Sequence, residues 1–129
     1  MGSQRFPRAA RLVKKPQFDA VFASGLRQHS DFFRVHVLPD TGAPARLGLA
    51  IAKRVAPRAV DRNRLKRAAR EAFRHHTEKL AGMDLVLHAK DAAVPATTPA
   101  LHADLARLFE RLPARMAART PAITTPRKP

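Results

Sequence analysis

The chain has 129 residues, of which 45% are hydrophobic, enough for one domain with a substantial core. It carries 25 Lys and Arg residues against 10 Asp and Glu residues, a formal net charge of +15, so it would repel itself unless a polyanion is its usual neighbour. Nucleic acid is therefore the first candidate partner and an anionic membrane the second. The excess of Arg, whose planar guanidinium suits phosphates and base edges, favours nucleic acid.

Some classes of protein are excluded by what the sequence lacks. The chain has no cysteine, which excludes disulfides and thiolate zinc sites. No apolar run approaches the roughly 18 residues that span a bilayer, and the N-terminus has no apolar signal block. We therefore expect a soluble protein of the cytoplasm.

The N-terminal part of the sequence predicts a basic arm followed by a short helix. Residues 1–15 are basic and lack a core pattern, so we expect an extended or partly ordered arm. Pro16 occupies a position that is favoured at the start of a helix, and Gly25 is placed to end it. The apolar residues at the spacing of one helical face are Phe18, Val21 and Phe22.

Two strands are predicted next. Residues 28–38 alternate in polarity, and any strand before Ser30 would be short and at an edge. The residues that point to one side are Phe33, Val35 and Val37, and those that point to the other are Phe32, Arg34, His36 and Leu38. A turn signal at 39–42 precedes a second apolar run at 46–52, so we expect a hairpin between the two runs.

The second half of the chain predicts helix, strand and helix. The main helix should cover 59–80, with Asp61 in its first turn, where a carboxylate is favoured. A strand at 83–89 follows. The closing helix should have Thr98 as its N-cap, and Pro113 should end or bend it. The leucines that give its apolar stripe are Leu101, Leu105, Leu108 and Leu112. This order of elements indicates an α+β sandwich of helices on a small mixed sheet.

The most informative segment is RNRLKRAAREAFR, residues 62–74. At about 100° per residue, its polar and apolar residues separate onto opposite arcs of a helix. The polar arc holds Asn63, Lys66, Arg67, Arg70 and Arg74, and the apolar arc holds Leu65, Ala68, Ala69, Ala72 and Phe73. A solvated helix face normally interleaves acidic residues, but only Asp61 and Glu71 are acidic between positions 54 and 77. The pattern therefore predicts a cationic face that binds phosphates.

Three motifs in order resemble the protein subunit of bacterial ribonuclease P. The segment LGLAIAKRVAPRAVDRNRLKRAAREAF, residues 47–73, is similar to the family signature, an Arg-Asn-Arg helix that follows a Gly-containing strand and a basic pair. Residues 11–25 (RLVKKPQFDAVFASG) are similar to the family's basic arm and first helix, and residues 82–90 (GMDLVLHAK) to its last strand. The resemblance covers about residues 11–112.

This resemblance implies a more specific fold than periodicity can give. Family members have an αβββαβα sandwich whose small mixed sheet contains a left-handed βαβ crossover, a fold shared with a domain of a small-subunit ribosomal protein. Parallel crossovers are right-handed in general, so physics alone would predict the opposite hand. We expect a basic arm at 1–15, the ribonuclease P protein domain at 16–118 and a disordered tail at 119–129.

The resemblance also implies a function. The protein would bind the catalytic RNA subunit of ribonuclease P and the 5′ leader of precursor tRNA, and the holoenzyme would remove that leader. Catalysis and the required Mg²⁺ would belong to the RNA, so the protein would contribute no catalytic residue, no metal ligand and no cofactor of its own. We expect it to act as a monomer in the holoenzyme.

Individual residues match the family's motifs. Those expected to bind the RNA subunit are Lys53, Arg54, Arg58, Arg62, Asn63, Arg64, Lys66, Arg67, Arg70 and Arg74. Those expected to line the leader-binding cleft are Phe18, Phe22, Arg34 and His36. The chain departs from the family at His36, where relatives often carry an aromatic residue, and at Ala52, where many have a small hydroxyl residue.

Other interpretations compete with this one. Phe18 and Phe22 would be core residues by default, or would both pack and stack on single-stranded RNA. A ribosomal protein or RNA chaperone of related fold would have the same composition. An autonomous nuclease is disfavoured because no carboxylate cluster suits a two-metal site, and His75 and His76 are too far apart around a helix to form a metal site.

Overall fold

The computed structural model describes residues 10–118, and it contains the expected αβββαβα order of elements. The predicted tail at 119–129 and most of the predicted arm, residues 1–9, lie outside the described residues. The elements are α1 (Lys15–Ala23), β1 (Leu26–His29), β2 (Phe33–Leu38), β3 (Arg46–Leu49), α2 (Ala59–Arg74), β4 (Asp84–Ala89), the short 3₁₀ helix η3 (Asp91–Ala93) and α3 (Thr98–Ala118).

The four-stranded sheet has the order β1-β2-β4-β3, and this order corrects the predicted hairpin. β2 pairs with β1 and β4, both antiparallel, whereas β3 pairs parallel with β4. The hairpin therefore joins β1 to β2, and β1 is the short edge strand expected before Ser30. β4 takes the centre because Leu85, Val86 and Leu87 are all fully buried, so this strand needs cover on both faces. Periodicity identifies the faces of a strand but not its neighbours.

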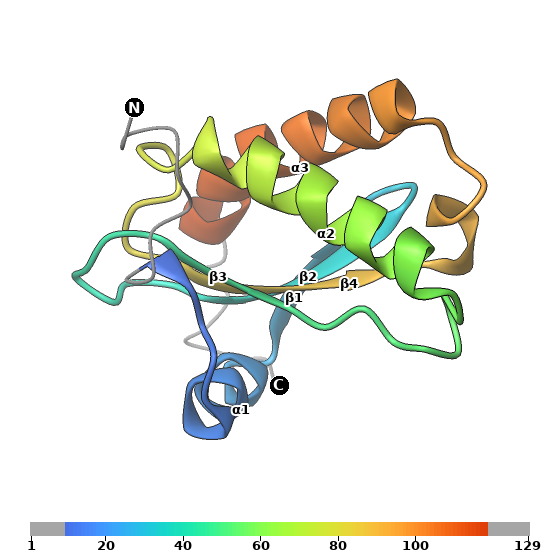
Figure 1. The fold of residues 1–129 in the computed structure, drawn as a ribbon. Helices are drawn as coiled ribbons and strands as arrows, with labels where there is room; N and C mark the ends of the chain where they lie inside the picture. Colours follow the sequence, from blue (N-terminus) through green and yellow to red (C-terminus); the bar gives the residue numbers. More distant parts are fainter. Residues whose placement is uncertain (1–9, 119–129) are drawn as a thin grey trace, which may run out of the picture.

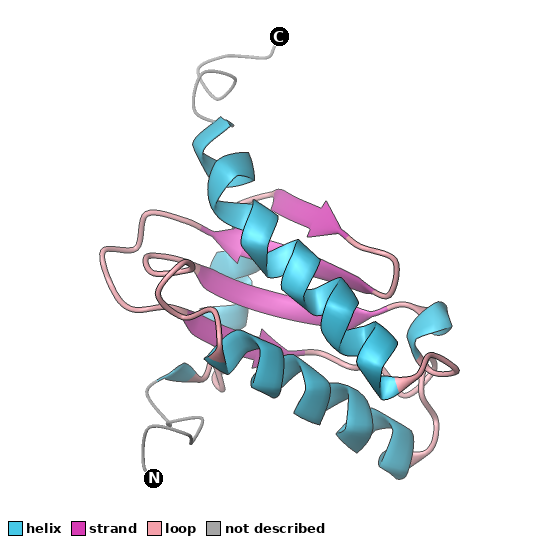
Figure 2. Ribbon diagram, turned by 90° about the horizontal axis from the view of Figure 1, so that it is seen from above, coloured by secondary structure: helices cyan, strands magenta, loops and turns pink. Residues whose placement is uncertain are grey.

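The sheet separates two unequal layers of helix (Figure 1). α2 and α3 lie side by side on one face, and α1 lies alone on the other (Figure 1). The β3–α2–β4 crossover is left-handed. In Figure 2 the helices face the viewer, and when this view is turned so that the parallel strands β3 and β4 point upward, β4 lies to the left of β3. The implied fold is confirmed, including the hand that general physics disfavours.

The main core lies between the sheet and the pair α2 and α3. The odd-numbered residues of β2, which are Phe33, Val35 and Val37, are fully buried there, as are Leu85 and Leu87 of β4. The opposite face has only a small cluster around Leu12, Val21 and Val86, with Phe18 packed against it. α1 thus covers one end of its face and leaves the rest of that face open.

Gly48 explains why the strand before the basic pair contains glycine. A Cβ at this position would lie 2.8 Å from Cζ of Phe18 and 3.0 Å from Cβ of Leu12. Real Cβ atoms do not approach that closely, so the missing side chain gives α1 and the arm their space against the sheet. The arm residue Arg11 forms a parallel bridge with Leu47, which fixes the described part of the arm along β3.

The ends of the helices differ in detail from expectation. α2 ends at Arg74 rather than at residue 80, and turns lead from there to Gly82, whose φ of +84° favours glycine. The N-cap of α3 is Thr97 rather than Thr98, because the Thr97 hydroxyl accepts a hydrogen bond from the backbone N–H of Ala100. α3 continues through Pro113, since Met116 extends its buried stripe beyond the proline.

Two buried carboxylates tie the elements together. Asp84 of β4 accepts two hydrogen bonds from the guanidinium of Arg46, at 2.6 and 2.9 Å. Asp104 of α3 accepts hydrogen bonds from the hydroxyl of Ser30 and from the backbone N–H groups of Asp31 and Phe32. Asp104 therefore shapes the turn that divides the predicted 28–38 strand into β1 and β2.

Candidate RNA interfaces

The first candidate interface is the exposed side of α2, as the helical arcs predict. The apolar arc of α2 is buried in the main core, and Asn63, Arg67 and Arg70 are exposed on the opposite side. We call Asn63, Lys66, Arg67 and Arg70 the α2 ridge. Within residues 10–118, the side chains of Asn63, Lys66 and Arg67 make no hydrogen bond and no ion pair. These donors are available to a ligand.

The α2 ridge carries a small polar hollow and extends onto the arm. The hollow has a volume of about 330 Å³ and is lined by Asn63, Arg67, Arg70, Glu71 and Arg74. Partial burial and the nearby charge of Arg11 lower the pKa of Arg70. Arg11 therefore lies close enough to contribute to the same positive surface. Three arginines around one hollow, with a fourth nearby, favour a phosphate oxygen there.

Other cations of the predicted set are bound to the protein itself. Arg62 donates hydrogen bonds to the carbonyl oxygens of Ala56 and Pro57, which closes the connector before α2. Arg64 donates to the carbonyl oxygens of Val94 and Ala96, at 2.6 and 3.0 Å, which holds the loop before α3. Helical periodicity does not predict these structural contacts, because they depend on backbone groups outside the helix. RNA binding by both residues stays a prediction.

Arg58 and Arg74 are also paired, although both remain accessible. Arg74 lies 2.7 Å from the carboxylate of Glu71, and Arg58 lies 3.9 Å from that of Asp61. The Arg58 side chain is exposed, and such a surface ion pair contributes little to stability, whereas the hydrogen bond between Arg74 and Glu71 is partly buried. Their predicted contact with RNA is compatible with this geometry.

The second candidate interface is the part of the sheet that α1 leaves open. The register places Arg27 and His29 of β1, Arg34 and His36 of β2, and His88 of β4 on this face. Phe22 of α1 leans over it, with its ring centroid 5.0 Å from that of His36 and 5.8 Å from that of His88. We call Phe22, Arg34, His36 and His88 the sheet cleft.

A hollow of about 240 Å³ continues the sheet cleft toward the end of β4. Arg34 and His88 line it together with Arg54 and Lys90. Arg54 lies beside this cleft, and Lys53 is exposed in the connector. Binding of the RNA subunit by these two residues stays a prediction. Ala52 lines the same hollow, so the position without the hydroxyl group faces the cleft.

The two predicted aromatic residues of α1 have different surroundings. Phe18 is half-buried and fills the space above Gly48, so it is mainly a packing residue. Phe22 is 40% exposed, an unusual value for a phenylalanine in a folded domain. The ring available for stacking is therefore that of Phe22.

Histidines give the sheet cleft a distinctive electrostatic character. Burial, followed by the charges of Arg34 and His36, lowers the pKa of His88 to about 4. Burial and then the charges of Arg34 and Arg27 also lower the pKa of His36. Both imidazoles are therefore neutral at pH 7 in the free protein. Nε2 of His88 is buried and has no hydrogen-bond partner within residues 10–118.

His88 and Lys90 are site residues that sequence reasoning missed. The period of the predicted strand at 83–89 would have placed His88 on the same side as Val86, and pairing with β2 then brings it opposite Arg34. Placing His88 beside Arg34 requires the knowledge that β2 pairs with β4, whereas the predicted hairpin paired β2 with the next strand along the chain. Lys90 follows the strand directly, and its ammonium group donates to the carbonyl oxygen of Ser30 at 2.7 Å.

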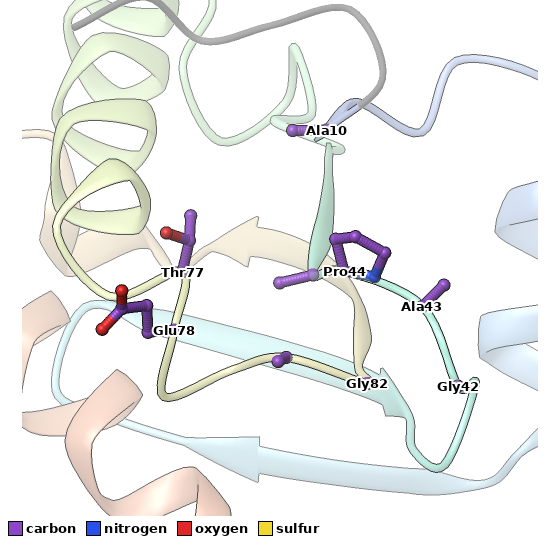
Figure 3. Close-up of a pocket in the computed structure, with 9 residues that line it drawn as sticks. Ala10, Gly42, Ala43, Pro44, Thr77, Glu78 and Gly82 are labelled. Carbon is purple, nitrogen blue, oxygen red and sulfur yellow. The ribbon is translucent and has the colours of Figure 1, made fainter. Parts of the chain in front are cut away.

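A third hollow has a different character (Figure 3). It has a volume of about 740 Å³ and lies between the Gly42–Ala45 loop and the turns after α2. Its wall consists mostly of small residues, among them Ala10, Ala43 and Pro44, with Glu78 as its charged group (Figure 3). Without a cation it does not suit a polyanion.

Residues 10–118 contain no group of three or more His, Asp or Glu side chains placed to hold a metal ion. Over the same residues, no helix combines the length and the apolar character that a transmembrane span requires.

A small α+β domain with two basic surfaces on opposite layers is typical of the class of RNA-binding proteins. A family model described as Ribonuclease P matches residues 6–113. The chain is 40% identical over 109 residues to the ribonuclease P protein component of Thioalkalivibrio sulfidiphilus, covering 84% of this chain and 91% of that protein. It is also 40% identical over 127 residues to the component of Xanthomonas oryzae pv. oryzae, covering 94% and 86%. The chain belongs to the ribonuclease P protein family.

Solved structures agree with this fold. The RNase P protein of Staphylococcus aureus superposes with a TM-score of 0.72 at 27% identity, covering 80% of this chain and 94% of that one. The RNase P protein of Thermotoga maritima gives a TM-score of 0.70 at 24% identity, covering 79% and 96%, a likeness of fold.

Proposed function

We propose that this protein is the RNA-binding subunit of a ribonuclease P holoenzyme, and that it assists a catalytic RNA in removing the 5′ leader from precursor tRNA. The observation that carries the proposal is the pair of basic surfaces on opposite layers of a chain that belongs to this family. The α2 ridge would contact the RNA subunit, and the sheet cleft would hold the single-stranded leader. The protein would be a monomer within the holoenzyme.

The two surfaces suit these two partners for physical reasons. The α2 ridge is a fixed row of cations on a helix with few acids, which suits the regularly spaced phosphates of folded RNA. The sheet cleft combines an exposed phenylalanine ring with cations at its margin, which suits unpaired bases and their backbone. Mg²⁺ for the cleavage step would be bound by the RNA, and the protein would reduce the repulsion between two polyanions.

Reconstitution tests the proposal. The protein is combined with the ribonuclease P RNA of the same organism, and cleavage of precursor tRNA is measured at low Mg²⁺ with and without protein. We expect cleavage by RNA plus protein, much weaker cleavage by RNA alone and none by protein alone. Equal rates with and without protein would contradict the proposal.

A pull-down of bound RNA separates this function from the alternative. A ribonuclease P protein should recover one long structured RNA in near equimolar amount. Recovery of many RNAs, or of a ribosomal subunit, would indicate an RNA chaperone or a ribosomal protein instead.

A further inference from the structure

We propose that the paired histidines of the sheet cleft, His36 and His88, couple binding of the leader to the uptake of protons, so that leader affinity rises as pH falls. The inference rests on the proposed leader-binding function of this cleft. It identifies the chemical group recognised there as a phosphate of a single-stranded RNA.

The first observation is the geometry of the ring cluster. The imidazole centroids of His36 and His88 are 5.1 Å apart, and the ring of Phe22 approaches both. The two histidines are neighbours on adjacent strands, since His36 is opposite Val86 and His88 is opposite Arg34. A strand of RNA that stacks on Phe22 would therefore pass both imidazoles.

The second observation is an unused hydrogen-bonding atom. Nε2 of His88 has no partner among the described residues although it is shielded from solvent, a state that costs free energy. The side chains that approach this imidazole are rings and cations, and the carboxylate that lines the same hollow belongs to the exposed Asp91. The backbone of Ala50 offers the imidazole one hydrogen bond, which raises the pKa of His88, but Nε2 has no partner among the described residues. A phosphate in the hollow that His88 lines would lie beside the imidazole, and its negative charge would favour the protonated form.

The third observation is the charge around the cluster. On the strands, Arg27, Arg34 and His29 face His36, while Arg34 and Lys90 lie near His88. Arg54 comes from the connector after β3. The acids of the neighbouring elements are Asp84, bound by Arg46, Asp19 of α1, paired with Lys15, and the exposed Asp91 at the far margin.

These surroundings determine the sign of the effect. In the free protein, burial and then the neighbouring cations lower the pKa of both imidazoles, which favours their neutral forms at pH 7. A bound phosphate offsets part of this positive charge and raises their pKa values toward the ordinary value of about 6.5. Because the bound state then holds more protons than the free state, affinity increases as pH falls below the bound-state pKa. Each proton taken up gives at most about a tenfold change per pH unit.

The experiment measures the ratio of holoenzyme affinities for precursor tRNA with its leader and for the same tRNA without it, between about pH 5.5 and 7.5, under conditions where cleavage is slower than binding. The ratio cancels pH effects on the RNA subunit and on the tRNA body. We expect the ratio to be at least about fivefold larger at the acidic end of this range than at the other. For the H36F/H88F variant, we expect this ratio to be the same at the acidic end of the range as at the other end.

A control variant and an NMR titration test whether the pH dependence comes from the two cleft histidines. H75Q removes a histidine on the opposite side of the sheet and should keep the pH dependence. Histidine NMR titration of the native protein, free and with a leader oligonucleotide, should show higher pKa values for both cleft histidines in the complex, whatever the stability of the variants. A ratio that favours the leader but does not change with pH would overturn the proton coupling alone. A ratio of one at every pH would overturn leader binding itself.

Discussion

The two faces of the sheet differ in how completely they are covered. The face under α2 and α3 is a closed core, and the RNA-binding candidates on that side lie on the outer surface of α2. The face under α1 is closed only near Val21 and Val86, and its remaining side chains are themselves the candidate site. The closed core thus underlies the α2 ridge, whereas on the other face the sheet itself is accessible to a ligand in the sheet cleft.

The comparison can be tested on adjacent residues of one strand. Leu87 and Val86 are both fully buried, but Leu87 points into the main core and Val86 into the small cluster under α1. We expect Leu87→Ala to lower the free energy of unfolding by about 4 kcal/mol and Val86→Ala by about 2 kcal/mol. Chemical denaturation measures both. Equal decreases would show that the α1 face is as well packed as the other.

Removal of the α2 ridge should have the next largest effect, and it concerns RNA rather than stability. We expect K66A/R67A/R70A to weaken binding to the RNA subunit about 100-fold, since each solvent-exposed contact between a cation and a phosphate contributes about 1 kcal/mol, or about fivefold. The slope of log affinity against log salt should fall by about 0.7–0.9 for each phosphate that the variant no longer neutralises. R115A, on α3, is the matched control. An unchanged affinity in a filter-binding titration would remove the docking role.

Removal of the Phe22 ring from the sheet cleft should have a smaller effect on RNA binding, and one that is selective for precursor tRNA. Because one stacked base contributes about 1–3 kcal/mol, we expect Phe22→Ala to weaken binding of precursor tRNA about tenfold and to leave binding of mature tRNA as it was. Phe18→Ala should chiefly lower the melting temperature, since Phe18 packs over Gly48. If substitution of Phe22 weakened binding of both tRNAs equally, its ring would be a packing residue only.

The smallest predicted difference separates two neighbouring arginines of α2. Arg64 donates two hydrogen bonds to the loop before α3, so Arg64→Ala should lower the free energy of unfolding by about 1–2 kcal/mol. Arg67 makes no such hydrogen bond within the described residues, so Arg67→Ala should leave stability unchanged and weaken RNA binding. Thermal melts and RNA titrations of the two variants distinguish these roles. The reverse pattern would show that the α2 ridge is wrongly defined.

The α2 ridge could be predicted from the sequence because a helix determines its own faces. The period of 3.6 residues separates Asn63, Lys66 and Arg70 from Leu65 and Ala69 without knowledge of any other element. The structural contacts of Arg62 and Arg64 could not be predicted in this way, because their partners are carbonyl groups of loops.

The sheet cleft was harder to predict because it depends on strand order. Alternation along β2 placed Arg34 and His36 on one face, but nothing in the local pattern paired β2 with β4 rather than with β3. Because the prediction paired β2 with β3, it did not place His88 beside Arg34 and His36 in the sheet cleft. The left-handed crossover was expected only from the resemblance to the family, since general chirality favours the other hand.

The central claim is that the two basic surfaces have separate partners, and one set of titrations tests it most directly. Affinities for the RNA subunit, for precursor tRNA and for mature tRNA are measured with the native protein, with R67A/R70A and with F22A. The account predicts that R67A/R70A weakens binding to the RNA subunit while the precursor-to-mature ratio within the holoenzyme is retained, and that F22A lowers that ratio while RNA-subunit affinity is retained. A lower ratio for R67A/R70A, together with an unchanged ratio for F22A, would contradict the account.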